Sequence, residues 1–222
     1  MRIPLTPYAV REIALFGGLG LALTAFVAWV AWPLWPIALL PLAITLWAFS
    51  FFRDPERRIP DDPRLLLAPA DGRVTHIETI DTPEELGGQG RSLRISIFLS
   101  VFNCHLNRAP CAGRVQRVIY RQGRYLSALN AASARENEQN LVILSAEAAG
   151  VSILVRQVSG AIARRIVCRV AAGDQLAAGQ RFGMIKFGSR TDLVVPTTAP
   201  VDVRVRVGDR VKAGLTVLGQ FQ

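Results

Sequence analysis

A run of 40 residues without a charged side chain, Ile13 to Phe52, constrains this chain more than any other feature of its sequence. One α-helix needs about 20 apolar residues to cross a bilayer, so the run is long enough for two helices. Pro33 and Pro36, in the segment WPLWP, interrupt a helix near the middle of the run, and the neighbouring Trp32 and Trp35 are of a type that anchors helix ends at a membrane interface. We therefore predict a hydrophobic helical hairpin with a tight turn at this point.

Arginines lie on both sides of the apolar run, Arg2 and Arg11 before it and Arg53, Arg57 and Arg58 after it. Because basic residues tend to stay on the cytoplasmic side, we expect both ends of the hairpin, and the domain that follows, on the cytoplasmic side of the cell membrane. The three later arginines either attract an anionic leaflet or form a solvated charge run. A signal peptide is a rival interpretation, but the run is too long and no small-residue cleavage site follows it. The sequence leaves open whether the hairpin spans the bilayer or enters one leaflet.

The rest of the chain is basic and poor in cysteine. The formal net charge is +9, of which the first 52 residues contribute only +1. A basic domain beside a membrane favours anionic lipid surfaces, and no nucleic-acid-binding motif accompanies the scattered arginines. Cys104, Cys111 and Cys168 have no paired spacing, which suits a reducing compartment and argues against a disulfide framework. We expect a membrane partner, no nucleic acid and no metal.

From residue 53 onward, short segments with two-residue alternation or β-branched residues are separated by Gly, Pro and Asn, a pattern typical of strands and turns. We predict a mostly β (α+β) chain, with a membrane-anchoring hairpin over residues 1–52 and a β domain over residues 53–222. The best helix candidate in that domain is GAIARRIV, residues 160–167. Residues 126–137 form either a loop or a short helix.

An internal repeat organises the end of the chain. The segments RVAAGDQLAAG, ending at Gly179, and RVRVGDRVKAG, ending at Gly214, match at a spacing of 35 residues. The shared pattern V-x-x-G-D-x-V-x-A-G describes a strand, a Gly-Asp turn in which glycine supplies a positive φ, and a second turn. Such units resemble the halves of lipoyl- and biotinyl-type domains. We therefore predict a barrel-sandwich-hybrid-like β domain.

Five motifs follow the apolar N-terminus in order: FFRDPERRIP, APADGRV, FLSVFNCHLNRAP, NEQN and MIKFGSR. Together they resemble the short form of the phosphatidylserine decarboxylase family over most of residues 51–192. An archaeal-type decarboxylase of phosphoserine lipids would look nearly the same. The resemblance implies a carboxy-lyase of phospholipid biosynthesis that converts phosphatidylserine to phosphatidylethanolamine and carbon dioxide, and that is made as a zymogen.

The resemblance also implies autocatalytic serinolysis between Gly188 and Ser189. The large chain 1–188 and the small chain 189–222 would then form a heterodimer, and the sequence leaves higher oligomers open. Ser189 would become a covalent pyruvoyl group, the cofactor that acts as electron sink when carbon dioxide leaves.

A serine hydroxyl is a weak nucleophile at neutral pH and needs a base oriented by a carboxylate. The family motifs match His105 to that base and Asp71 to that carboxylate, which gives a proposed Asp71-His105-Ser189 triad, whereas His76 is interpreted as structural. Longer relatives carry a second histidine three positions after the first and an aspartate two positions before it. This chain has Arg108 and Asn103 there. We therefore expect His105 to serve both self-cleavage and turnover.

Two other functions fit parts of the sequence. A lipoyl- or biotinyl-like carrier would remain one intact chain and carry its modification on Lys186, but it would not need the FNCHLNRAP segment. A membrane-anchored adaptor of efflux machinery shares the barrel halves, yet it would normally have a long coiled coil, and no sustained heptad is present. The identity of the lipid tails is not encoded in any motif.

Overall fold

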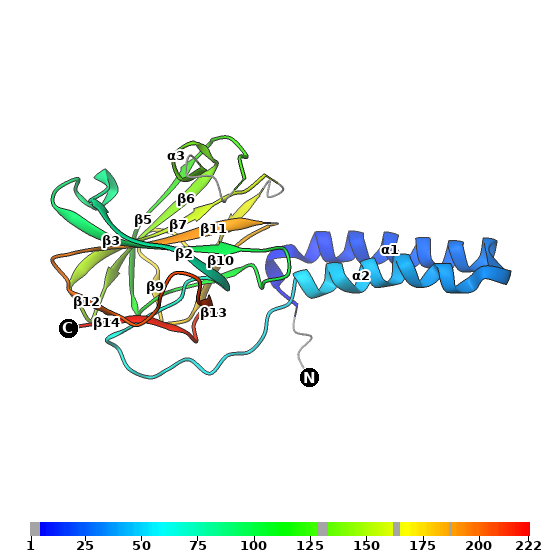
Figure 1. Ribbon diagram of the computed structural model, residues 1–222, viewed down its shortest axis with the longest axis horizontal. Helices are drawn as coiled ribbons and strands as arrows, with labels where there is room; N and C mark the ends of the chain where they lie inside the picture. Colours follow the sequence, from blue (N-terminus) through cyan, green and yellow to red (C-terminus); the bar gives the residue numbers. More distant parts are fainter. Residues whose placement is uncertain (1–4, 128–132, 162–164, 187) are drawn as a thin grey trace. The chain divides into compact units, whose positions relative to one another are not determined.

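The computed structural model of the protein describes residues 5–127, 133–161, 165–186 and 188–222. The chain divides into two compact units, Met1–Glu56 and Arg57–Gln222. The first unit is helical and the second is mostly β, which confirms the predicted fold class (Figure 1).

The helical unit is the predicted hairpin. After the short 3₁₀ helix η1 (Pro7–Ala9), helix α1 (Val10–Val30) is followed by the 3₁₀ helix η2 (Trp32–Ala38) and by α2 (Leu39–Phe51), so the turn falls on the WPLWP segment. Glycines on α1 let the two helices approach closely. A Cβ on Gly20 would lie 2.1 Å from Thr45 Oγ1, and one on Gly17 would lie 2.7 Å from the Phe49 ring.

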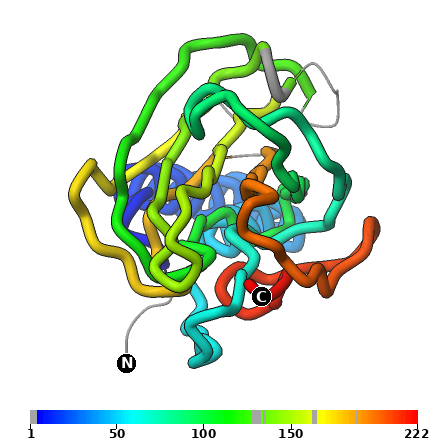
Figure 2. Tube along the Cα trace, turned by 90° about the vertical axis from the view of Figure 1, so that its left-hand side faces the viewer, coloured from blue at the N-terminus to red at the C-terminus, as the bar shows by residue number. Residues whose placement is uncertain are grey.

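The β unit contains a curled sheet that forms a half-barrel (Figure 2). Among the described residues, eight strands follow the order β13-β2-β3-β11-β7-β6-β5-β9, and two three-stranded sheets have the orders β1-β14-β12 and β4-β10-β8. Within the described residues, these strands pair with one another only in antiparallel fashion. The strands are β1 (Leu65–Leu67), β2 (Gly72–Asp81), β3 (Arg91–Leu99), β4 (Leu106–Arg108), β5 (Gly113–Arg121), β6 (Gln139–Ala146), β7 (Val151–Val158), β8 (Ile166–Cys168), β9 (Gln175–Leu176), β10 (Arg181–Ile185), β11 (Ser189–Pro196), β12 (Val201–Val203), β13 (Arg210–Val211) and β14 (Val217–Phe221). Short helices η3 (Glu84–Leu86) and α3 (Ser133–Glu136) lie in its connections.

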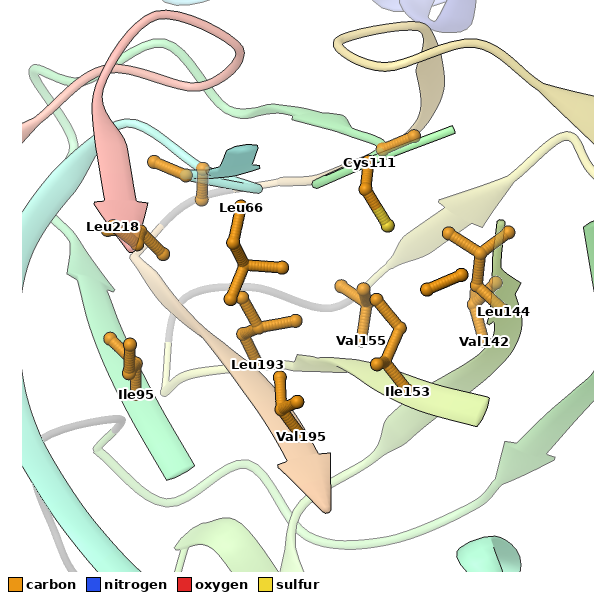
Figure 3. Close-up of a cluster of buried hydrophobic side chains, with 14 of the residues drawn as sticks. Leu66, Ile95, Cys111, Val142, Leu144, Ile153, Val155, Leu193, Val195 and Leu218 are labelled. Carbon is orange, nitrogen blue, oxygen red and sulfur yellow. The ribbon is translucent and has the colours of Figure 1, made fainter. Parts of the chain in front are cut away.

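The eight-stranded sheet has two faces, which differ in what they bury. Because side chains alternate along a strand, odd-numbered residues of β11 and β7, such as Leu193 and Val155, point into the main core between the sheets. Even-numbered ones, such as Val194 and Leu154, join a smaller cluster on the opposite face. We call these the inner and the outer face. Figure 3 shows the inner-face side chains pointing toward one another.

The predicted repeat builds two equivalent turns. Gly173 and Gly208 have φ values of 100° and 99°, a region that favours glycine. In each turn the following aspartate accepts a backbone hydrogen bond, Asp174 from Ala171 at 2.9 Å and Asp209 from Arg206 at 2.8 Å. The strands after these turns, β9 and β13, pair with β5 and β2.

The partner strands form a second repeat that the sequence analysis missed. The segments APADGRV, residues 68–74, and APCAGRV, residues 109–115, match at a spacing of 41 residues. Gly72 and Gly113 each sit where a Cβ would lie 2.1 Å from a carbonyl oxygen of the neighbouring strand. The half-barrel therefore combines two similar halves, β2 with β13 and β5 with β9.

The expected helix at residues 160–167 is wrong where the structure describes it. Ile166 and Val167 belong to β8, whose backbone pairs with β10, and residues 162–164 lie outside the described residues. The β-branched pair has a strand partner available, and tertiary pairing overrides the weak helical pattern. For residues 126–137, where a loop or a short helix was expected, the structure shows the short helix α3. Residues 128–132 lie outside the described residues.

Candidate active site

The inner face of the sheet changes from apolar to polar at one end. Leu193 and Val195 of β11 face the main core, and by the same alternation Thr191 and Ser189 lie on that face. Two residues of neighbouring strands extend the polar end, Gln157 of β7 and Asn140 of β6. All four polar side chains are buried.

Asn107, on β4, connects this polar end to two other segments. Its side-chain nitrogen donates to Thr191 Oγ1 at 3.0 Å and to the Pro69 carbonyl oxygen at 3.3 Å. Its side-chain oxygen accepts from Gln157 Nε2 at 2.9 Å, and the Gln157 oxygen accepts from Asn140 at 2.9 Å. This buried network joins three of the five sequence motifs and includes Thr191, the residue directly after a fourth. Its central residue, Asn107, was not among the predicted site residues, although it lies within the FLSVFNCHLNRAP motif.

Ser189 is the first residue of β11 and is completely buried. Its Oγ makes no hydrogen bond to any residue that the structure describes. Gly188, directly before it, has a φ of 58°, a conformation that a residue with a side chain rarely adopts. The predicted cleavage bond therefore joins a glycine in the left-handed conformation to a serine. The buried hydroxyl of that serine has no hydrogen-bond partner among the described residues.

His105 is held at the same end of the sheet by two connections. Its carbonyl oxygen accepts from the Ile185 backbone N–H at 3.2 Å, four residues before Ser189. Leu99, the ladder partner of Ser189, begins the loop that leads to His105. The His105 Nδ1 lies 2.9 Å from the carbonyl oxygen of Asn103, an atom that can only accept, so Nδ1 carries a proton. In the neutral ring the buried Nε2 is then the basic nitrogen.

Asp71 contacts a different group from the one expected. Its carboxylate pairs with both terminal nitrogens of the Arg57 guanidinium, at 2.6 and 2.8 Å, and accepts from the Ala213 backbone N–H at 2.8 Å. In the described structure Asp71 makes no hydrogen bond to His105. Arg57 also donates to the Ala213 carbonyl oxygen, and its side chain is only 5% exposed. Both membrane-related interpretations of Arg57 are therefore wrong, because its charge is buried against a carboxylate.

The second repeat shows that Asp71 is not needed to form its turn. The equivalent position in the other half is Ala112, where the same A-P-x-x-G-R-V segment folds without a carboxylate. Two similar backbones thus differ by one buried acid. The hydrogen bonds that Asp71 makes in the described structure are with Arg57 and the Ala213 backbone.

The two departures from the longer relatives have structural roles here. Asn103 closes a turn, because its side-chain oxygen accepts from both the backbone and the hydroxyl of Ser100, at 2.9 and 2.8 Å. Arg108 is buried and donates to the Gly179 carbonyl oxygen at 3.0 Å, within the second turn of the repeat.

The other candidate residues are His76, the three cysteines and Lys186. His76 is exposed on β2, with its Nδ1 3.1 Å from Thr75 Oγ1. All three cysteines are free, and burial raises the pKa of Cys111 to about 12, so this thiol stays protonated at neutral pH. Lys186 is 5% exposed, which removes support for a carrier whose lysine must be presented to a modifying enzyme.

Comparisons with known proteins point to one family. A model of the family described as phosphatidylserine decarboxylase matches residues 44–219. The chain is 47% identical over 185 residues to the phosphatidylserine decarboxylase proenzyme of Desulfotalea psychrophila, which is 83% of each chain. It is 45% identical over 182 residues, 82% of each chain, to the protein of that name from Ruegeria pomeroyi. By the match to this family model, and to both relatives over more than four fifths of its length, the chain belongs to the phosphatidylserine decarboxylase family.

Proposed function

We propose that the chain is a proenzyme that cuts itself between Gly188 and Ser189 and then decarboxylates phosphatidylserine. The observation that carries this proposal is the buried Ser189 hydroxyl, directly after a left-handed glycine and without a hydrogen bond to the described residues. A buried polar group without a partner costs folding free energy, so its presence in a folded protein calls for an explanation. Self-cleavage supplies one, and the relatives are named as proenzymes.

The proposed cleavage uses the two residues at the bond and a base. The Ser189 oxygen attacks the Gly188 carbonyl carbon, the peptide C–N bond breaks, and the nitrogen takes up a proton, leaving an ester. β-Elimination then releases the chain that ends in the Gly188 carboxylate. Hydrolysis of the dehydroalanine at position 189 yields the pyruvoyl group and ammonia. Glycine suits the position before the bond because it leaves the carbonyl carbon unhindered.

His105 is the proposed base. With Nδ1–H held by the Asn103 carbonyl oxygen, Nε2 is available to take the proton of the Ser189 hydroxyl. We further propose that the same nitrogen returns a proton to the product during turnover. A single histidine doing both fits the structural roles of Asn103 and Arg108, which occupy the positions where longer relatives differ.

Asp71 is proposed to assist as the triad carboxylate without a direct hydrogen bond to His105 in the uncut chain. Its nearest connection to the site runs through Pro69, whose carbonyl oxygen accepts from Asn107 and from the Arg108 backbone at 3.0 Å. The ion pair between Asp71 and Arg57 therefore holds in place the segment that contains Pro69, to which Asn107 donates its hydrogen bond.

The surroundings of Ser189 fit the proposed cofactor. A pyruvoyl group supplies an electron sink for the loss of carbon dioxide from the serine headgroup. Leu99, opposite Ser189 in the ladder, is a buried apolar side chain, and an apolar wall disfavours the charge of the substrate carboxylate. Asn107 and Thr191 provide the polar side.

The hairpin is proposed to anchor the enzyme where its substrate lies. Pro7–Val30 and Trp32–Phe51 are long and apolar enough to cross a membrane. Large apolar side chains on them are exposed, among them Trp29 at 77% and Leu40 at 66%, which is unfavourable in water. By the distribution of arginines, we propose that the β unit is on the cytoplasmic side.

The test of the proposal is the intact mass of the full chain in detergent, followed by a lipid assay. We expect two species, residues 1–188 and a pyruvoyl-capped 189–222, and conversion of phosphatidylserine to phosphatidylethanolamine. Ser189→Ala is expected to stay uncut and inactive, while Ser152→Ala on β7 should cut normally. His105→Ala should block or strongly slow cleavage, with His76→Ala as its control. A chain that stays uncut yet turns over lipid would refute the assignment.

The archaeal-type substrate is tested in the same assay. Phosphatidylserine and an isoprenoid ether lipid with a phosphoserine headgroup are supplied separately, and we expect faster turnover of phosphatidylserine because both relatives are named for it. Faster turnover of the ether lipid would move the chain to the alternative substrate while leaving the cleavage chemistry in place.

A further inference from the structure

The outer face of the sheet carries a cavity of about 570 Å³ that the decarboxylation chemistry does not use. Arg156 of β7 and Arg94 of β3 lie on this face, since their neighbours Val155 and Ile95 point into the main core. The inner face, with Ser189, is on the other side of the same sheet. The charged residues that line the cavity are Glu78, Asp81, Arg91, Arg94, Arg121 and Arg156.

Three of the four lining arginines have an acidic partner. Arg91 pairs with Asp81 at 2.8 Å, Arg94 with Glu78 at 2.6 Å, and Arg121 with Glu85 at 2.5 Å. Arg156 has no ion pair among the described residues. The aspartate opposite it in the ladder, Asp192, is held by Arg190 through two hydrogen bonds, at 2.6 and 3.1 Å. The cavity wall therefore carries one positive charge that its acidic groups do not match.

Two arginines of the cavity, Arg94 and Arg156, also have hydrogen-bond donors without an acceptor among the described residues. The Nε atoms of Arg94 and Arg156 are both buried and lack a hydrogen-bond acceptor in the described structure. Burial lowers the pKa of the Arg156 guanidinium, with partial compensation from Asp192 and Glu85, although arginine stays cationic in proteins. Buried N–H donors on cations are costly unless an acceptor reaches them, and a bound anion would be such an acceptor.

We propose that this cavity is an accessory site for a phosphate-bearing anion, held by Arg156 and Arg94 from the two strands that flank β11. A tetrahedral oxyanion accepts from several guanidinium groups at once, which a planar carboxylate does less well. The cavity exceeds the volume of a bare phosphate ion, so it also has room for a phosphodiester headgroup. Gln139 adds a buried amide at the cavity wall, and its side-chain oxygen has no hydrogen-bond partner among the described residues. Rotating the amide by 180° exchanges this oxygen for the NH₂ group, which can donate to an anion.

The first experiment measures phosphate binding to the uncut Ser189→Ala chain in detergent, by calorimetry and by the shift in Tm, at constant ionic strength set with chloride. Using the uncut chain separates this site from the cofactor, so the result does not depend on the proposed function. We expect saturable binding and a rise in Tm. Arg156→Gln should weaken binding on the order of tenfold or more. Arg114→Gln, an exposed arginine on β5 outside this cavity, should bind as the parent does.

A second variant shows whether a loss of binding comes from the site or from misfolding. Arg121 has a half-exposed side chain at the cavity, so Arg121→Gln is expected to fold and to weaken phosphate binding less than Arg156→Gln does. No saturable binding by the parent chain would overturn the proposal. Equal binding by the parent and by both cavity variants would overturn it as well, because the ion would then bind elsewhere.

A competition arm distinguishes the two sources of phosphate. Glycerophosphoglycerol presents the phosphodiester of a lipid without its tails, and inorganic phosphate presents the free ion. Tighter binding of the diester would support a lipid headgroup as the occupant, and tighter binding of inorganic phosphate would support a soluble ion. Loss of both with Arg156→Gln is expected in either case, and retention of both would contradict the site.

Discussion

Asn107 tests whether the buried polar network positions the cleavage bond in addition to stabilising the sheet. Its side chain contacts Pro69, Gln157 and Thr191, and it lies two residues after His105. Asn107→Ala leaves buried partners without hydrogen bonds, which costs about 1–3 kcal/mol of unfolding free energy for each unsatisfied group. We also expect self-cleavage to slow by about tenfold or more, since small misplacements of reacting groups are costly.

Gel densitometry over time gives the fraction of cut chain, and thermal unfolding of the uncut Ser189→Ala form gives the stability. Gln116→Ala is the matched control, because it removes an exposed hydrogen bond to Ser152 and is expected to change neither quantity by much. Parent-like cleavage by Asn107→Ala would show that the network does not position the bond.

The Asp71–Arg57 pair allows a structural role of Asp71 to be distinguished from a role in the reaction. Asp71→Asn leaves the Arg57 guanidinium buried without a countercharge, which is expected to cost about 3–5 kcal/mol. Replacing both residues, as in Arg57→Met with Asp71→Leu, removes both charges and should recover much of that stability. If Asp71 assists His105, the double variant stays slow in cleavage although it is stable.

Denaturant unfolding and intact mass, taken on the same samples, provide the two measurements. Arg91→Met with Asp81→Leu serves as the control, because that pair is exposed and distant in sequence from the cleavage site. Cleavage restored together with stability would assign Asp71 a purely structural role.

At the scale of elements, the two glycines that begin β2 and β5 set the packing of the two half-barrel repeats. A Cβ at position 72 would lie 2.1 Å from the carbonyl oxygen of Phe98, a backbone atom with little freedom to move. Gly72→Ala should therefore push β2 away from β3 and lower stability by several kcal/mol, in line with other strongly overpacked sites.

Gly87→Ala makes the matched comparison. Its φ of 103° strains a side chain, but nothing lies within 4 Å of the new Cβ, so we expect a cost of only about 1–3 kcal/mol. Thermal unfolding of both variants in the uncut form tests the difference. A smaller loss for Gly72→Ala than for Gly87→Ala would mean that the sheet absorbs the extra carbon.

At the scale of the whole molecule, cleavage at 188/189 would divide the chain in the middle of its largest sheet. The segment after the bond contains β11, which lies between β3 and β7, and also β13 and β14, which pair with β2 and β1 (Figure 1). Leu193, Val195, Leu218 and Phe221 from this segment are buried in the main core. We therefore expect the two chains to remain associated after cleavage.

Size-exclusion chromatography of the cut protein in detergent should give one peak that contains both chains. Guanidinium chloride should separate them only at the concentration at which the β unit unfolds. The uncut Ser189→Ala chain supplies the unfolding reference. Release of the 189–222 chain well below that midpoint would contradict the prediction.

Patterns that are local in sequence sufficed for the hairpin, the β class, the Gly-Asp turns and the order of the family motifs. Apolar length, two-residue alternation and glycine at positive φ act over a few residues, so they can be recognised without coordinates. The helix expected at 160–167 was wrong because β10 offers a partner that only the fold brings near. The Arg57 partner of Asp71, the Asn107 network and the arginines of the outer face join residues 14 to 84 positions apart. Tertiary structure alone decided these, because they depend on strand order and register.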